Sequence, residues 1–166
     1  MIVAFTGHRP QKIGGYDMQN PTALAVWRKV HDLLKELKPE KTISGMALGV
    51  DQLCACASID LGIPVIAAIP CDGQESIWPQ NSQDHYHWIL AQTDEQVVVS
   101  PGPYSVDKMM KRNAYMVDRC DTLIAVFDGT KGGTSNCVRY AEKKGKRIIV
   151  IDPSKFNPIS KRWLDA

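Results

Sequence analysis

Six short apolar runs alternate with longer segments of helical character, and this alternation restricts the fold more than any other feature of the chain. The runs occupy residues 2–5, 42–44, 65–69, 96–100, 123–127 and 147–151. Most of them are apolar at successive positions rather than at every second one, which is typical of strands buried on both faces of a sheet. The sequence therefore predicts six strands in a buried sheet.

Five helices are expected between these strands. The first begins after Asn20, an N-cap residue followed by Pro21, and its apolar residues recur at helical spacing up to Pro39. The other four are expected at about residues 50–61 and 83–92, from the cap Ser105 to Cys120, and from the cap Thr134 to Gly145. Because strands and helices alternate, we predict an α/β fold, a single Rossmann-like three-layer sandwich with a mostly parallel sheet and helices on both faces.

The composition fits one ordinary globular domain. The chain has 166 residues, of which 44% are hydrophobic and 23% are charged, so we expect a single domain over residues 1–166. Twenty Lys and Arg residues against eighteen Asp and Glu residues give a net charge of +2. This charge is too small to indicate a dedicated duplex nucleic-acid binder, and a nucleic-acid partner is not expected.

Membrane, disulfide and metal classes are not supported by the sequence. No apolar run approaches the roughly 18 residues of a spanning helix, and the apolar start lacks the basic flank of a signal peptide, so we expect a cytoplasmic protein with no membrane partner. The five cysteines are an odd number without C-x-x-C spacing. His85 and His87, two apart on a predicted helix, point in different directions. Neither a metal nor a cofactor is expected.

Three polar, glycine-rich loops follow predicted strands. Residues 6–10 follow the first strand, residues 44–51 the second and residues 128–135 the fifth. Ligands of open parallel sheets bind beyond the carboxyl ends of the strands, near the point where strand order reverses. We therefore expect the ligand at these loops, where His8 and Arg9 would meet a bound anion.

Residues 132–135, Gly-Gly-Thr-Ser, have a specific use in phosphate binding. Glycines let a phosphate approach the backbone, and the free N–H groups at the start of the following helix hold it, with hydroxyl donors from Thr134 and Ser135. The alternative is an ordinary strand-to-helix turn in which Thr134 is only the cap. Residues 45–51 are a similar case. Neither loop has the Gly-Lys-Ser/Thr of a P-loop, so ATP hydrolysis of that kind is not expected.

Arg112 and Asn113 are polar residues on an otherwise apolar helical stripe. With residues placed at intervals of 100°, Asn113 falls near the centre of the stripe and Arg112 at its edge. The Asn113 amide must find hydrogen-bond partners there, either in a ligand or in two loops that it joins. Arg112 either holds a phosphate or lies in solvent at the helix flank. If Arg112 holds a phosphate, Arg112→Ala should weaken binding and leave the melting temperature of the unliganded protein nearly unchanged.

Together these motifs resemble the YpsA-like branch of the SLOG superfamily. The segments that carry the resemblance are residues 6–10, 44–52, 69–79, 112–118 and 132–136, and it extends over residues 1–152. The resemblance implies a Rossmann-like fold and a ligand that is a nucleotide or is derived from one. Relatives also imply a homodimer.

Two better understood relatives sharpen this expectation. The LOG phosphoribohydrolases, which release a base from a nucleoside 5′-monophosphate, use an Arg-Lys-x-x-Met helix and a Pro-Gly-Gly-x-Gly-Thr-x-x-Glu loop. Residues 112–116 resemble the helix and residues 133–137 the loop, but Cys137 occupies the position of the catalytic glutamate. A thiol cannot replace a carboxylate in stabilising an oxocarbenium-like centre, so the resemblance supports phosphate binding more than hydrolysis. Residues 44–51 also resemble a loop of DprA, which loads recombinase onto single-stranded DNA.

The sequence thus favours a module that binds a nucleotide-derived small molecule. The expected ligand and phosphate contacts are Gly7, His8, Arg9, Ser44, Gly45, Gly49, Asp51, Arg112, Asn113, Gly132, Gly133, Thr134 and Ser135. The first alternative is a nucleotide N-glycosidic hydrolase, with Arg112 and either Asp51 or Glu75 as the catalytic candidates. The second is a single-stranded nucleic-acid module, although the strong basic groove that this task needs is not evident.

Overall fold

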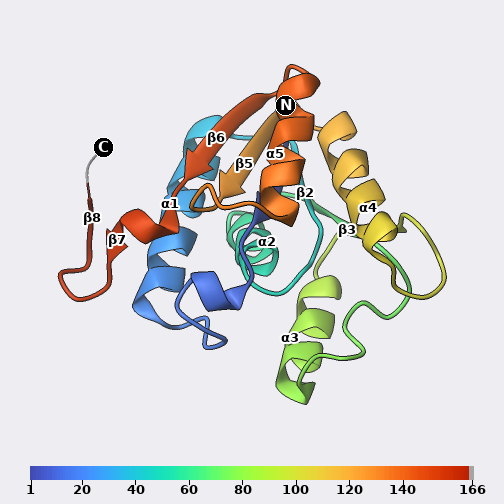
Figure 1. The fold of residues 1–166 in the computed structure, drawn as a ribbon, viewed down its shortest axis with the longest axis horizontal. Helices are drawn as coiled ribbons and strands as arrows, with labels where there is room; N and C mark the ends of the chain where they lie inside the picture. Colours follow the sequence, from blue (N-terminus) through green and yellow to red (C-terminus); the bar gives the residue numbers. More distant parts are fainter. Residues whose placement is uncertain (165–166) are drawn as a thin grey trace.

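The computed structural model describes residues 1–164, and its main element is a six-stranded sheet between two layers of helices (Figure 1). The strands are β1 (Ile2–Gly7), β2 (Lys41–Ser44), β3 (Val65–Ile69), β4 (Glu95–Val98), β5 (Thr122–Val126) and β6 (Arg147–Ile151). Every pairing in this sheet is parallel. The predicted α/β, Rossmann-like fold is confirmed.

The helices lie close to the ranges that the sequence predicts. They are α1 (Pro21–Leu37), α2 (Val50–Asp60), α3 (Gln80–Leu90), α4 (Val106–Arg119) and α5 (Gly133–Lys143). Asn20 caps α1 by accepting the N–H of Ala23 at 2.9 Å, and Ser105 caps α4. The expected cap of α5 was wrong. Its N-cap is Gly132 rather than Thr134, because the Ser135 hydroxyl hydrogen-bonds to the backbone of Gly132 and adds residues to the first turn.

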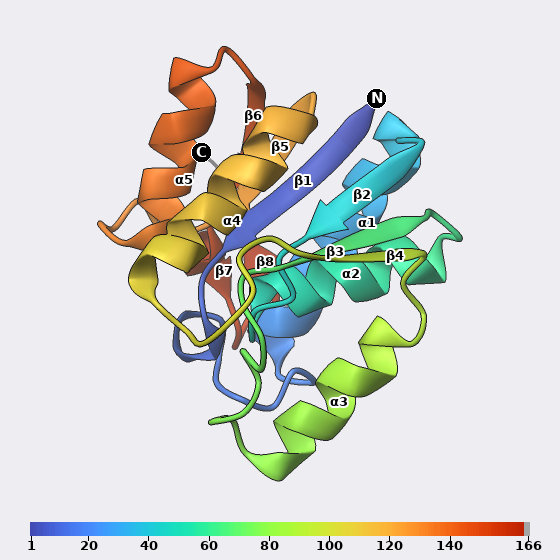
Figure 2. The same cartoon turned by 90° about the vertical axis from the view of Figure 1, so that its right-hand side faces the viewer.

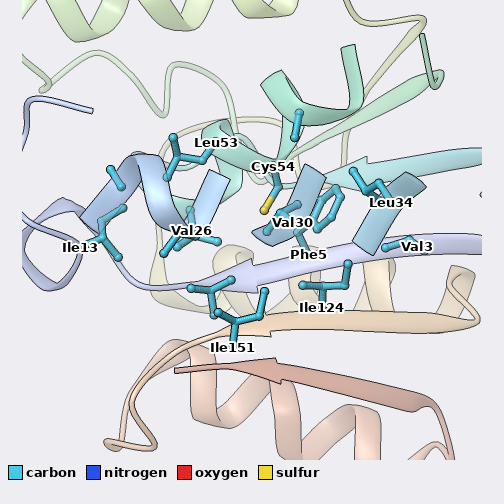
Figure 3. Packing of buried hydrophobic residues seen from close by; sticks show 14 residues of the cluster. Val3, Phe5, Ile13, Val26, Val30, Leu34, Leu53, Cys54, Ile124 and Ile151 are labelled. Carbon is cyan, nitrogen blue, oxygen red and sulfur yellow. The ribbon is translucent and has the colours of Figure 1, made fainter. Parts of the chain in front are cut away.

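The helices lie in two layers, one on each face of the sheet (Figure 2). Alternate residues of the strands pack against these two layers. On one face, Phe5 and Ile124 contact Val30 and Leu34 of α1, and α2 completes this cluster (Figure 3). Helix α3 packs on the same face against β3. On the other face α4 and α5 cover β1 and β5. The central strands are therefore buried on both sides, which explains their continuously apolar sequences.

The order of the strands, β4-β3-β2-β1-β5-β6, places the reversal of the sheet between β1 and β5. The chain adds β2, β3 and β4 outward from β1, and then crosses back to place β5 on the other side of β1. The loops that leave β1 and β5 consequently diverge to opposite faces. A crevice at the carboxyl ends of these two strands is the expected ligand position in such a sheet.

A small C-terminal hairpin, which the sequence analysis did not predict, lies beside α1 (Figure 1). Its strands β7 (Phe156–Asn157) and β8 (Arg162–Trp163) are antiparallel. The rings of Phe156 and Trp163 meet edge to face at 5.2 Å, and the ammonium of Lys29 lies 4.2 Å from the centre of the Trp163 ring. Short 3-10 turns span Pro10–Lys12 and Pro153–Lys155. Within residues 1–164, no helix combines the length and the apolar character needed to cross a membrane.

Candidate functional site

A pocket of about 340 Å³ lies where the carboxyl ends of β1 and β5 diverge. It is lined by Thr6, Gly7, His8, Arg9, Lys12, Ala47, Asp51, Met109, Arg112, Asn113, Thr130, Lys131, Gly132, Gly133 and Thr134. The structure thus brings together residues from the loops after β1 and β5, from the loop before α2, from the first turn of α2, and from the middle of α4. Most of the residues singled out in the sequence lie here.

One wall of the pocket is the N-terminus of α5. Among residues 1–164, no acceptor pairs with the backbone N–H groups of Gly133, Thr134 and Ser135, and the first amide of the helix to be paired is that of Asn136, which donates to the Gly132 carbonyl at 3.0 Å. A Cβ added to Gly132 or Gly133 would meet no atom within 4 Å. The backbone here is open to an approaching group, and the free amides carry the positive end of the helix dipole.

The Ser135 side chain is already used by this helix end. Its hydroxyl accepts the N–H of Gly132 at 2.9 Å and donates to the carbonyl of the same residue at 2.9 Å. Ser135 does not line the pocket. Of the two hydroxyl residues that the sequence offered, Thr134 is the one whose position gives it access to a ligand.

Cationic side chains surround the opening of the pocket. Arg9 and Lys131 are exposed, and Lys12 is half-exposed. The Lys12 ammonium donates to the Asp128 carboxylate at 3.0 Å and to the Thr130 hydroxyl at 2.8 Å. An anion entering from solvent therefore meets positive charge before it reaches the amides of α5.

His8 and Asp128 join the two loops across the crevice. The His8 Nε2 atom lies 3.0 Å from an Asp128 carboxylate oxygen and 2.9 Å from the Asp128 backbone nitrogen. Hydrogen bonds from Thr130, and then from Lys12, hold the pKa of Asp128 well below its usual range. The His8 imidazole thus fixes the spacing of the loops after β1 and β5, in addition to lining the pocket.

Arg112 is buried and has protein partners on three sides. Its side chain is 3% exposed, and its Nη1 atom donates to the carbonyls of Gly45 at 2.6 Å and Ala68 at 3.3 Å, while its Nε atom donates to the Asn113 side chain at 3.1 Å. Burial lowers the pKa of Arg112. The alternative of a solvent-exposed arginine at the helix flank was wrong, because Arg112 is buried. Since Arg112 joins the ends of β2 and β3 to α4, we now expect its removal to destabilise the unliganded protein, contrary to the prediction from the sequence.

Asp51 is the acidic residue of the pocket. It is 6% exposed, and one carboxylate oxygen accepts the N–H of Ala47 at 3.3 Å. Burial raises the pKa of Asp51, and the nearby Arg112 and Arg9 guanidinium groups oppose this shift. The carboxylate therefore costs free energy when it is ionised and unliganded.

Apart from Ala47, the glycine-rich loop after β2 supports the pocket rather than lining it. Ser44, Gly45 and Gly49 are absent from the lining. The Ser44 hydroxyl donates to the Asp51 carbonyl at 2.8 Å and accepts the N–H of Met46 at 3.1 Å. A Cβ on Gly45 would lie 2.5 Å from the Arg112 guanidinium, and one on Gly49 would lie 2.5 Å from the His8 carbonyl. These glycines are needed for close packing.

Cys137, which occupies the position of the LOG catalytic glutamate, and the catalytic candidate Glu75 lie outside the pocket lining. Cys137 is 2% exposed, and burial raises the pKa of its thiol to about 11. It is a neutral core residue at neutral pH, with a hydrogen bond to the Thr6 side chain. Glu75 pairs with His87 at 3.2 Å. Asp51 is thus the candidate carboxylate that reaches the pocket.

The structure adds pocket residues that the sequence analysis did not single out: Thr6, Lys12, Ala47, Met109, Thr130 and Lys131. Thr130 and Lys131 belong to residues 128–135, a loop that the sequence had marked, so membership of that loop was the available signal. Lys12 lies in the turn Pro10–Lys12 and carried no such signal, because its position beside the loop after β5 depends on the tertiary structure. No cluster of three or more His, Cys, Asp or Glu side chains suited to a metal occurs in the described part of the chain.

Comparison with known sequences gives one family and several relatives. The family model described as the YspA SLOG family matches residues 3–156. An uncharacterized SPbeta prophage-derived protein of Bacillus subtilis, YoqJ, is 36% identical over 146 residues, which cover 76% of this chain and 85% of that protein. A UPF0398 protein of Bacillus cereus is 25% identical over 155 residues, covering 87% of this chain and 84% of the relative.

Comparison with solved structures shows the same fold at low identity. DNA processing protein A (DprA) from Streptococcus pneumoniae has a TM-score of 0.66 at 20% identity, over 89% of this chain and 49% of that one. A DprA structure from Helicobacter pylori, described for its single-stranded DNA binding mode, has a TM-score of 0.64 at 20% identity, over 90% and 64% of the two chains. A molybdenum cofactor binding protein from Rippkaea orientalis has a TM-score of 0.58 at 18% identity, over 91% and 76%. This chain spans about half of the pneumococcal DprA.

Proposed function

We propose that this chain, which belongs to the YspA SLOG family, binds a phosphorylated ligand of mononucleotide size, a nucleotide or nucleotide derivative, in the pocket between β1 and β5. The observation that carries the proposal is the N-terminus of α5. Two of its unpaired amides, those of Gly133 and Thr134, belong to residues that line a pocket with a cationic rim. Backbone amides at a helix start are a general anion-binding arrangement.

The position of each group supports a phosphate at this wall. The amides of Gly133 and Thr134 supply the hydrogen bonds, and the open Gly132–Gly133 backbone allows close approach. Lys131 and Arg9 supply positive charge from both loops. A phosphate oxygen here gains charge-assisted hydrogen bonds, which are about twice as strong as neutral ones.

The volume of the pocket supports a small ligand. At about 340 Å³ it lies near the lower limit of small-molecule sites, which are roughly 300–1,000 Å³. One nucleotide fits this size better than a dinucleotide. The nucleoside part would face Asp51, Asn113 and Met109, which line the inner side of the pocket.

A thermal-shift panel tests the proposal. Nucleoside 5′-monophosphates, cyclic nucleotides and ADP-ribose are compared with the matching nucleosides. A ligand at 100 times its dissociation constant adds about 2.7 kcal/mol, which corresponds to a rise in melting temperature of roughly 5–10 °C for a domain of this size. We expect phosphorylated compounds to raise the melting temperature and nucleosides to leave it unchanged. Equal shifts by both would contradict a phosphate subsite.

The variant Gly133→Ala locates the phosphate. Gly133 lacks a positive φ, and its added Cβ meets no protein atom within 4 Å, so the methyl group stands in the space that a phosphate would occupy. We expect the variant to bind the best phosphorylated compound at least tenfold more weakly. Unchanged affinity in a folded variant would move the phosphate away from α5.

Two alternative functions are tested with the same purified protein. N-glycosidic hydrolysis would depend on Asp51, the candidate carboxylate that lines the pocket, and is tested by following free base released from nucleoside monophosphates. A single-stranded nucleic-acid function is suggested by the fold shared with DprA, and is tested by salt-dependent binding of a labelled oligonucleotide. A cytoplasmic location and a homodimer remain predictions from the sequence.

A further inference from the structure

We infer that the pocket contains a second subsite, formed by Asp51 and Arg112, that receives the vicinal hydroxyl groups of a ribose. The inference rests on the proposed phosphate site and specifies its substrate class. The ligand is then a ribonucleotide or another ribose phosphate, and its 2′-deoxy counterpart binds more weakly.

The first observation is that Asp51 has one carboxylate oxygen to spare. The Oδ2 atom accepts the Ala47 N–H, whereas no donor from residues 1–164 reaches Oδ1. The side chain is 94% buried and lines the pocket. Among the described residues, every fully buried side-chain nitrogen or oxygen atom has a hydrogen-bond partner, so Oδ1, which has none, is not fully buried. Oδ1 therefore faces the cavity. A carboxylate oxygen at a cavity wall without a protein donor is free to accept a hydrogen bond from a ligand hydroxyl.

The second observation is that Arg112 presents a spare donor to the same cavity. Its Nη1 and Nε atoms have protein acceptors, and within the described residues its Nη2 atom has none. Arg112 is 97% buried and lines the pocket. One acceptor and one donor, both held in place by the core, therefore face the cavity from α2 and α4.

The third observation is that these opposite charges do not pair with each other. The ion pairs of residues 1–164 do not include one between Asp51 and Arg112. Both side chains nevertheless line the same pocket, where the Arg112 guanidinium lowers the pKa of Asp51 against the effect of burial. A group that both donates and accepts can bridge them, and a vicinal diol does so with one hydroxyl donating to Oδ1 and the other accepting from Nη2.

The charges around Asp51 distinguish a diol from other partners of a carboxylate. A ligand cation would meet the guanidinium groups of Arg9 and Arg112, which both lie close enough to lower the pKa of Asp51. A neutral diol meets no such repulsion. In a ribose 5′-phosphate the diol and the phosphate belong to one small unit, which suits a single pocket with an anion site at one wall and Asp51 at another.

The test compares ribonucleotides with their deoxy partners. The probes are AMP, GMP, CMP and UMP and the four matching 2′-deoxynucleotides, with affinities measured by calorimetry on the full chain. Wild-type protein should bind the ribo form at least tenfold more tightly, because a hydrogen bond to a charged group is lost in the deoxy form. Asp51→Asn should reduce this ratio to threefold or less. The matched control Asp60→Asn, on the exposed end of α2, should keep the wild-type ratio.

The outcomes separate this inference from the proposed function. Equal affinity of wild-type protein for ribo and deoxy forms overturns the diol subsite, while the phosphate site stands; this result decides the matter even if Asp51→Asn fails to fold. A preference confined to GMP and dGMP, with no difference between them, also overturns it, because Asp51 would then recognise a base edge. Gly133→Ala should weaken both forms equally and keep their ratio. Binding of none of the eight compounds overturns the inference for nucleoside monophosphates, and the cyclic nucleotides and ADP-ribose of the thermal-shift panel then decide the proposed function.

Discussion

The loops after β2 and β5 both contain several glycines, and the structure uses them in opposite ways. Residues 44–51 include two glycines and residues 128–135 include three, and both segments are short and lead into a helix. In residues 44–51 the glycines are closed in by other atoms, and the Ser44 hydroxyl and Gly45 carbonyl are paired within the protein. In residues 128–135 the glycines face open space, and three helix amides have no acceptor among residues 1–164.

This difference shows that the neighbours of a glycine, rather than the glycine itself, decide its function. At Gly49, the missing side chain lets the start of α2 approach the loop after β1, and this contact sets the position of Asp51. At Gly133, the missing side chain leaves room for a ligand. One loop builds the site and the other offers it to a ligand. Substitutions should therefore affect stability in the first loop and binding in the second.

The largest effect is expected for Gly49→Ala. Gly49 has φ +96°, and an added Cβ would lie 2.5 Å from the His8 carbonyl oxygen. The variant therefore combines backbone strain with a collision between the new methyl group and the main chain. We expect a loss of about 4 kcal/mol of unfolding free energy, measured by urea denaturation. The control is Gly62→Ala, which shares a positive φ of +71° but meets no atom within 4 Å, and should lose only about 1–2 kcal/mol. Equal losses would show that the collision contributes nothing.

Arg112→Ala should be the next largest. The variant removes the donor that joins Gly45 and Ala68 to α4, and it leaves the buried Asp51 carboxylate without its neighbouring positive charge. We expect a loss of about 3 kcal/mol in the unliganded protein. Arg119→Ala is the control on the same helix, because Arg119 is exposed and hydrogen-bonds only within its own turn, and it should lose less than about 1 kcal/mol. A melting temperature of Arg112→Ala equal to that of wild type would contradict the structural role.

A smaller pair of effects, opposite in sign, is expected at the two loop carboxylates. The pKa of the Asp51 carboxyl group is raised in the folded protein. Its ionisation therefore destabilises the fold as the pH rises above 3.8, the usual pKa of this group, and Asp51→Asn should increase stability at pH 7. The pKa of Asp128 is lowered, so its stabilising effect is present above 3.8 and is lost as pH falls, and Asp128→Asn should decrease stability at pH 7. Thermal melts between pH 3 and pH 8 measure both. Changes of the same sign at pH 7 would refute this contrast between the loops.

The smallest effect on stability is expected for Gly133→Ala. With open space around the added methyl group and no positive φ, alanine restricts the unfolded chain and suits the first position of α5. The unliganded variant should gain about 0.5 kcal/mol. A loss of more than about 1 kcal/mol would place Gly133 with the closed glycines of the β2 loop and would end the contrast between the two loops.

Local features of the sequence were sufficient for the elements of the fold. The apolar runs predicted all six strands of the main sheet to within about two residues, because a strand buried on both faces must be apolar along its length. Asn20 with Pro21, and Ser105, fixed two helix starts, because a cap acts over three or four residues. The cap of α5 was misplaced because capping depends on so few residues. Two adjacent hydroxyl residues, Thr134 and Ser135, were equivalent candidates by local sequence, whereas the N-cap in the structure is Gly132. The C-terminal hairpin was missed because its strands are only two residues long and therefore carry no periodic pattern.

The assembly of the site was decided by tertiary structure. The sequence marked the loops after β1, β2 and β5, but it gave no means of distinguishing a packing glycine from an open one, since that distinction depends on atoms far along the chain. Arg112 pairs with a carbonyl 67 residues away, and His8 with a carboxylate 120 residues away. The strand order sets these neighbours, and it is a property of the whole sheet. Sequence thus supplied the chemical groups of the pocket, and the packing of α2, α4 and α5 on the sheet determined which of those groups remain free to meet a ligand.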